Sequence, residues 1–236
     1  MTPYEASLRK KLTQAITLNS ALSKWRTVTG YDSVSEESIL QTLIQQIEAV
    51  NQQFDNQLQQ YQALSERRHH LAAESDDCVK KITCRLWEDI GSQFRGGTVA
   101  NDLLKILCQK ILRFPLPGFP VSKRNPLQYK TVRLYEDSFA LLGQYFGWLI
   151  DLLSVVNFDP VRPPHCLDEL RNRAAQFNTL SQQLMQEAEE LRNLQLKQDQ
   201  LYKQLNQAMR IAKGRLVVYK REIQPVTDLL IKRSAF

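Results

Sequence analysis

Apolar residues recur every seven positions along two long segments of the chain. In the first segment the main row contains Leu40, Ile47, Phe54 and Tyr61, and parallel rows start at Leu43 and Ile44. In the second segment the main row contains Leu170, Phe177, Leu184, Leu191 and Leu205. Adjacent rows of this kind form an apolar stripe wide enough for the face of a helical bundle. We therefore predict two helices of about 55–60 residues, each about 85–90 Å long.

Local signals place the ends of these two helices. Ser33 precedes the first segment and Glu36 follows three residues later, which is the spacing of a capping box. The pair Gly96-Gly97 is expected to stop that helix. In the second segment Pro163-Pro164 stand before the first turn, and Pro225 is expected to end or kink the helix.

A shorter apolar helix is predicted before each long one, over residues 4–28 and 132–156. Each shorter helix ends in a similar turn, which reads VTGYDSV at Val28–Val34 and VVNFDPV at Val155–Val161. Gly30 and Asn157 are the residue types that best tolerate the left-handed conformation after a helix. We expect the aromatic residue that follows each of them to fold back onto the last helical turn.

The recurrence of this turn indicates an internal duplication. A Val-x-x-Asp-Leu-Leu motif at Val99–Leu104 has a shorter counterpart at Val226–Leu230, and we expect a break and a short tail helix after each long helix at these motifs. We predict an all-α fold: an elongated bundle with two long antiparallel, coiled-coil-like helices, shorter helices and a pseudo-two-fold relation between the halves. The units are expected at residues 1–113 and 130–236. They are joined by a proline-rich linker at 114–129 that packs along a helix, and together they form one bundle.

The charge of the chain is concentrated near its C-terminus. The net charge is +6, and residues 203–236 contain eight Lys or Arg against the two acids Glu222 and Asp228. Four of these basic residues share one helical face: Arg210, Lys213, Lys220 and Arg221. This face is a candidate site for an anionic partner, either a nucleic acid or an anionic membrane. The alternative interpretation is an ordinary solvated helix face.

Residues 138–150 form the most apolar stretch, bounded by Asp137 and Asp151. Thirteen residues are too few to span a bilayer, so the stretch is expected to be a core helix, with a membrane-inserting element as the alternative. The N-terminus lacks the pattern of a secretory signal, and the four cysteines form no CxxC pair. These features predict reduced thiols and a cytoplasmic location.

Candidate chemistry in the sequence is sparse. His70, Glu74, Asp77 and Cys78 have spacings that place them on one side of a helix, as in a metal site. Bundle metal sites draw ligands from at least two helices, so we predict no metal here. No nucleophile-and-base arrangement and no glycine-rich phosphate loop is present, and we predict neither catalytic residues nor a cofactor.

Arg68 and Gln198 occupy core rows of the two long helices, where polar residues can fix register or partner choice. The sequence therefore favours a non-enzymatic interaction or scaffold protein that acts through long helical faces. Its partner is expected to be another protein or a second copy of the chain. Two alternatives remain: binding of an anionic surface through the basic C-terminal helix, and an insertion-competent protein that uses residues 138–150.

Overall fold

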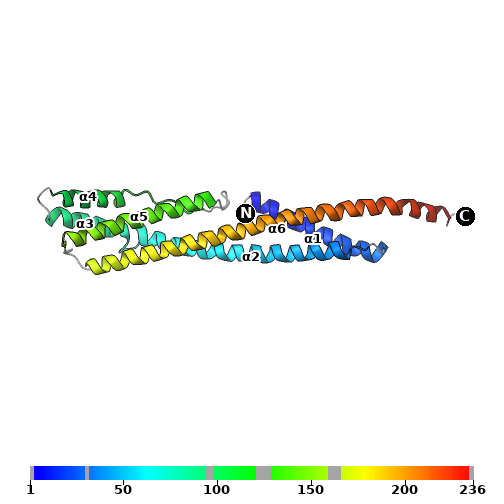
Figure 1. Cartoon of the computed structure of the whole chain (residues 1–236), viewed down its shortest axis with the longest axis horizontal. Coiled ribbons are helices and arrows are strands. Elements are labelled where there is room, and N and C mark those ends of the chain that lie inside the picture. Colours follow the sequence, from blue (N-terminus) through cyan, green and yellow to red (C-terminus); the bar gives the residue numbers. More distant parts are fainter. Residues whose placement is uncertain (1–2, 30–31, 94–97, 121–128, 159–165, 234–236) are drawn as a thin grey trace. The chain divides into compact units, whose positions relative to one another are not determined.

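The computed structural model describes residues 3–29, 32–93, 98–120, 129–158 and 166–233, with side chains described over 6–27, 32–93, 98–120, 130–158 and 166–220. These residues are almost entirely helical and contain no strand, which confirms the all-α prediction. In chain order the helices are α1 (Pro3–Thr29), α2 (Val34–His69), a π-helical turn (His70–Glu74), α3 (Val79–Gln93), α4 (Val99–Leu112), α5 (Tyr129–Val155) and α6 (Leu167–Arg233) (Figure 1).

The chain divides into two compact units that are interleaved in sequence. The first unit combines residues 1–55 with 193–236, and the second contains residues 56–192. Helices α2 and α6 each contribute one part to each unit. The sequential units expected at residues 1–113 and 130–236 stay a prediction, whereas the first compact unit joins the two ends of the chain.

The first unit is a three-helix arrangement of α1, the N-terminal part of α2 and the C-terminal part of α6 (Figure 1). Its buried core includes Leu22 from α1, Ile47 from α2 and Leu205 from α6, all fully buried. The Gln198 amide donates to Asn51 Oδ1 at 2.9 Å, and Arg215 pairs with Glu36. Glu36 comes before Asn51 in α2, whereas its partner Arg215 comes after Gln198 in α6, so the two helices are antiparallel here.

The second unit packs α3, α4 and α5 against the adjoining ends of α2 and α6. Its buried core includes Leu86 from α3, Leu104 from α4, Phe139 and Phe146 from α5, and Phe177 from α6. Helix α4 contacts both α3 and α5. A Cβ atom on Gly143 of α5 would lie only 3.2 Å from the ring of Phe177 on α6. Glycine at this position therefore allows α5 and α6 to approach closely.

The prediction of an unbroken first long helix is wrong. Helix α2 ends at His69, and a π-helical turn leads to Ser75, which has an extended backbone with ψ of 160°. The Cys78 amide donates to the Ser75 carbonyl at 3.2 Å before α3 begins. Ser and Asp side chains compete for backbone hydrogen bonds and favour turns, and Ser75-Asp76-Asp77 concentrates them at the break.

The second long helix is longer than predicted. Helix α6 contains 67 residues and continues past Pro225 to Arg233, so the expected end or separate tail helix at that proline is absent. The expected stop at Gly96-Gly97 lies outside the described residues, and α3 itself ends at Gln93.

The turn after α5 has the predicted geometry. Asn157 has a positive φ of 50°, which is the left-handed conformation expected at a helix C-terminus. Phe158 folds back, since its amide donates to the Leu153 carbonyl at 3.0 Å and its side chain is buried. The matching residues Gly30 and Tyr31 lie outside the described part of the chain.

The predicted capping box at the start of α2 does not form. The Ser33 hydroxyl bonds to the Glu37 carboxylate, and Asp32 Oδ1 accepts from the Val34 amide at 3.4 Å. Glu36 instead pairs with Arg215 of α6. A tertiary ion pair therefore replaces the local cap that the sequence suggested.

The proline-rich linker packs on helices as predicted over its described part. The ring of Phe114 contacts that of Tyr145, with centroids 6.2 Å apart. The ring of Phe119 contacts Tyr135 and Tyr61 at 6.1 and 5.7 Å. Residues 121–128 of this linker lie outside the described residues.

Candidate functional site

An exposed apolar surface covers α4 and α5 in the second unit. Seven large apolar side chains on these helices are exposed: Val99, Leu103 and Ile106 on α4, and Leu134, Leu141, Trp148 and Val155 on α5. The α5 residues are seven apart, and the α4 residues are four and three apart, so each set forms one row along its helix. We call these seven residues the α4–α5 apolar surface.

Side-chain contacts join the two rows. Lys110 continues the α4 row at the next four-residue step, and its Nζ lies 5.2 Å from the centre of the Tyr145 ring. Tyr145 in turn contacts Trp148, with ring centroids 5.8 Å apart. Since Trp148 is 53% exposed, this chain of contacts leads from the outer face of α4 to the outer face of α5.

Charged residues border this surface on both helices. On α4 and just beyond its end they are the exposed Asp102, Lys110 and Arg113 and the half-buried Lys105. On α5, Lys130 and Arg133 precede Leu134, and the exposed acids are Asp137, which pairs with Arg133, and Asp151. The stretch from residue 105 to 113 is therefore basic, whereas Asp151 is the one charged residue of α5 between residues 141 and 155.

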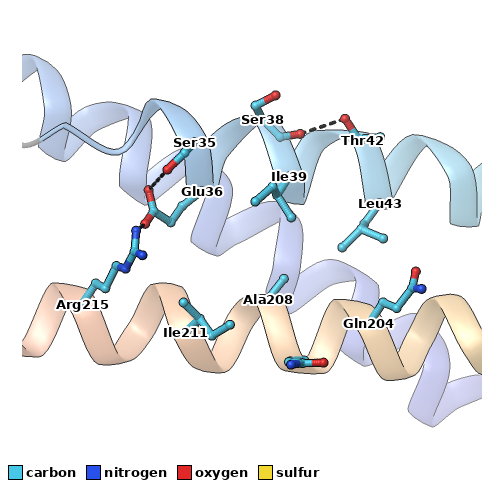
Figure 2. A pocket seen from close by; sticks show the side chains of 11 residues that line it. Ser35, Glu36, Ser38, Ile39, Thr42, Leu43, Gln204, Ala208, Ile211 and Arg215 are labelled. Atoms are coloured by element: carbon cyan, nitrogen blue, oxygen red, sulfur yellow. Dashed lines mark hydrogen bonds and ion pairs between the residues drawn. The ribbon is translucent and has the colours of Figure 1, made fainter.

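A groove lies in the first unit, between α2 and α6. This groove has a volume of about 570 Å³, and its apolar lining includes Ile39, Leu43, Ala208 and Ile211. Figure 2 shows these side chains pointing between the two helices, with the Glu36–Arg215 ion pair at one end. The hydroxyls of Ser35 and Thr42 are already bonded, to Glu36 and to the Ser38 carbonyl, so the groove offers mainly apolar contact.

The predicted anion-binding face is exposed as far as the structure describes it. Arg210, Lys213 and Lys220 are exposed on α6 and form no ion pair with any described residue. Arg210 also lines a depression of about 800 Å³ beside Arg215 and Tyr219. Arg221 lies in α6 but outside the residues whose side chains the structure describes.

Arg68 lies at the centre of a buried polar network in the second unit. Its guanidinium is fully buried and bonds to both carboxylate oxygens of Glu136 on α5, with Nη2 3.0 Å from Oε1. The Tyr61 hydroxyl donates to the same carboxylate at 2.6 Å, and Ser65 bonds to Tyr135 at 2.5 Å. The guanidinium also lies over the Phe139 ring, 4.1 Å from its centre.

This network is structural in character. Burial raises the pKa of the Tyr61 hydroxyl far above its usual value, and the charge and hydrogen bond of Glu136 raise it further. Tyr61 therefore stays protonated and acts as a hydrogen-bond donor. Gln198, which the sequence paired with Arg68, bonds to Asn51 in the first unit and contributes to a different core.

The residues with metal-site spacing are not brought together. His69 and His70 both face Glu74, at 3.3 and 3.5 Å, while Cys78 is buried beyond the helix break. In the part of the chain that the structure describes, no group of three His, Cys, Asp or Glu side chains could hold a metal ion. Burial raises the pKa of the Cys108 thiol to about 12, so this cysteine is a poor nucleophile.

The segment Lys130–Val155 is long and apolar enough to cross a membrane by length and mean hydropathy. The sequence expectation considered only residues 138–150 and is too narrow, because the helix continues beyond Asp137 and Asp151. One face of this helix is packed in the core of the second unit, and 39% of its most apolar window is buried. Soluble core helices share these properties.

Comparison with protein-family models, with curated proteins and with solved structures finds no match to this chain.

Proposed function

We propose that the chain is a non-enzymatic helical interaction or scaffold protein that binds another protein chain through the α4–α5 apolar surface. The observation that supports this proposal is the exposure of seven large apolar residues on two helices that pack together. Contiguous exposed apolar patches on soluble proteins mark interaction sites, whereas isolated exposed apolar residues do not. The exposed Trp148 beside Tyr145 adds the aromatic side chains that are enriched in binding hot spots.

Site-specific photo-crosslinking tests this proposal. A photo-reactive amino acid in place of Ile106 is expected to form a covalent adduct with a protein chain on irradiation of the native cells. The same amino acid in place of Gln182, which is exposed on α6, is the control and is expected to form none. Absence of adducts at both Ile106 and Trp148 would argue against the proposed function.

A second candidate function is binding of an anionic surface through Arg210, Lys213, Lys220 and Arg221. It is favoured by the exposure of the first three residues without an acidic partner among the described residues. We expect binding to duplex DNA or to vesicles with phosphatidylserine at about 20 mM salt, and a steep loss toward about 200 mM. The double variant Arg210→Glu/Lys213→Glu should lose this binding. No binding by the native chain at low salt would exclude this function.

We also propose that the two halves arose by duplication and pair as an antiparallel coiled coil. In support, α1 and α5 each contain 27 residues and each precedes a long helix on which it packs. Each unit combines one such helix with parts of both long helices. An experimental structure in which the α1–α2 and α5–α6 pairs do not superpose would contradict the duplication.

A further inference from the structure

The charge pattern around the α4–α5 apolar surface points to its occupant. We propose that this occupant is a second copy of the same chain, packed about a two-fold axis parallel to the helices. This inference rests on the proposed function, since it names the partner of the same surface. In this arrangement α4 of one copy lies over α5 of the other, and the four helices form a bundle.

The direction of α4 relative to α5 fixes which residues meet. Phe114 contacts Tyr145, and Phe119, five residues later, contacts Tyr135. The chain that leaves α4 therefore runs antiparallel to α5. The contacts of Lys110 and Phe114 with Tyr145 fix the relative position of α4 and α5 along their axes. Asp151 lies six residues after Tyr145, and both helices rise equally per residue, so Asp151 lies between Lys105 and Lys110 along the axis of α4.

A two-fold axis parallel to the helices preserves these levels when it exchanges the two copies. Asp151 of one copy then faces the stretch from Lys105 to Lys110 of α4 in the other copy, and the same pair forms twice. Every neighbouring helix in the bundle is antiparallel, which is also favourable for the helix dipoles. An axis perpendicular to the helices would place α5 over α5, where Asp151 would meet no Lys or Arg between residues 134 and 155.

The apolar centre of the surface supplies the attraction in this arrangement. Leu103 and Ile106 on α4 are about half exposed, and so is Trp148 on α5. Pairing buries each of them against the opposite helix of the other copy. Asp151 forms no ion pair with a described residue of its own chain, so a partner's lysine would meet an unpaired carboxylate.

The first measurement is the mass of the purified full chain by light scattering coupled to size exclusion. We expect twice the chain mass of 27.4 kDa at concentrations of about 10–100 µM. Trp148→Glu and Leu103→Glu should each give the single-chain mass with native far-UV circular dichroism, because the replaced side chains are exposed. Val217→Glu, at an exposed apolar position of the first unit, is the matched control and should keep the double mass.

Reversing the charges of Lys110 and Asp151, singly and together, tests whether these residues pair between the two copies. Lys110→Glu and Asp151→Lys should each raise the dimer dissociation constant about tenfold, as expected for an ion pair at an interface rim. The double variant restores opposite charges between the copies and should return to within about threefold of the native value. A double variant no tighter than either single variant would overturn the proposed axis.

The remaining outcomes separate this inference from the proposed function. A monomer at about 100 µM, or a dimer that Trp148→Glu leaves intact, overturns the self-pairing. If the chain is monomeric but the photo-reactive residue at Ile106 links it to a protein of different mass, the proposed function stands with another partner. If phosphatidylcholine vesicles bind the monomer and Trp148→Glu abolishes this binding, the occupant is a lipid surface and both proposals are wrong.

Discussion

Glu136→Leu is expected to lower the free energy of unfolding of the second unit by about 3–5 kcal/mol. The replacement removes the carboxylate that accepts hydrogen bonds from Arg68 and Tyr61. It leaves the Arg68 guanidinium fully buried without a counter-charge. Denaturant unfolding followed by far-UV circular dichroism measures the change. The adjacent Asp137→Leu is the control, since Asp137 is exposed and pairs loosely with Arg133, and it should cost less than about 1 kcal/mol.

The double variant Arg68→Leu/Glu136→Leu separates the cost of an unpaired charge from the value of the pair. Either single variant should be strongly destabilised, whereas the double variant should recover most of the loss, because no unpaired charge remains buried. If the double variant lost as much unfolding free energy as the two single variants together, Arg68 and Glu136 would not act as a unit. If Arg68→Leu alone changes neither the melting temperature nor the oligomeric state, the predicted register role of Arg68 is wrong.

The sequence predicted which residues are buried more accurately than where the helices end. Leu40, Ile47 and Tyr61 in the first segment are buried, as the seven-residue spacing required. The same spacing continues through the helix break, because Ala72, Val79 and Leu86 are also buried. Because the seven-residue spacing of buried residues is the same on both sides of Ser75, this spacing could not predict the helix break there.

The buried polar network could be predicted only in part, because its members are distant in sequence. The position of Arg68 in a core row identified a buried polar residue, and the structure confirms its burial. Its partner Glu136 lies 68 residues away on another helix, beside the exposed Asp137. Nothing in the spacing of these two acids distinguishes the buried one from the solvated one, because that depends on which face of α5 meets α2.

The α4–α5 apolar surface was missed for a related reason. Helix α5 carries apolar residues on most of its circumference, so the sequence suggested a wholly buried helix. Which row stays exposed is decided by how Lys110 of α4 and Phe114 of the linker cover Tyr145 and leave Trp148 accessible. The basic face of α6 requires only helical geometry to place Arg210, Lys213 and Lys220 on one side, and its role in anion binding stays a prediction.

Phe139→Ala is expected to destabilise the second unit by about 3–5 kcal/mol. Phe139 is fully buried, and its ring contacts Tyr135 and Phe177 with centroids 5.1 and 6.5 Å away. Truncation leaves a cavity in a core that draws on α2, α5 and α6, where the surrounding helices cannot close in freely. Met185→Ala is the control, because this apolar side chain is 51% exposed on α6, and its truncation should cost less than about 1 kcal/mol. Chemical denaturation of each variant gives the comparison.

A cavity alone does not account for the position of Phe139, whose ring also faces the Arg68 guanidinium at 4.1 Å. Phe139→Leu fills most of the space but offers no ring to the cation. We expect it to cost about 1–2 kcal/mol more in the native background than in Arg68→Leu/Glu136→Leu, where no cation remains. Equal costs in the two backgrounds would show that the ring contributes packing only. An unequal cost would mean that the cation held by Glu136 is also stabilised by the aromatic face of Phe139, so that one buried cluster fixes the position of α5 against α2.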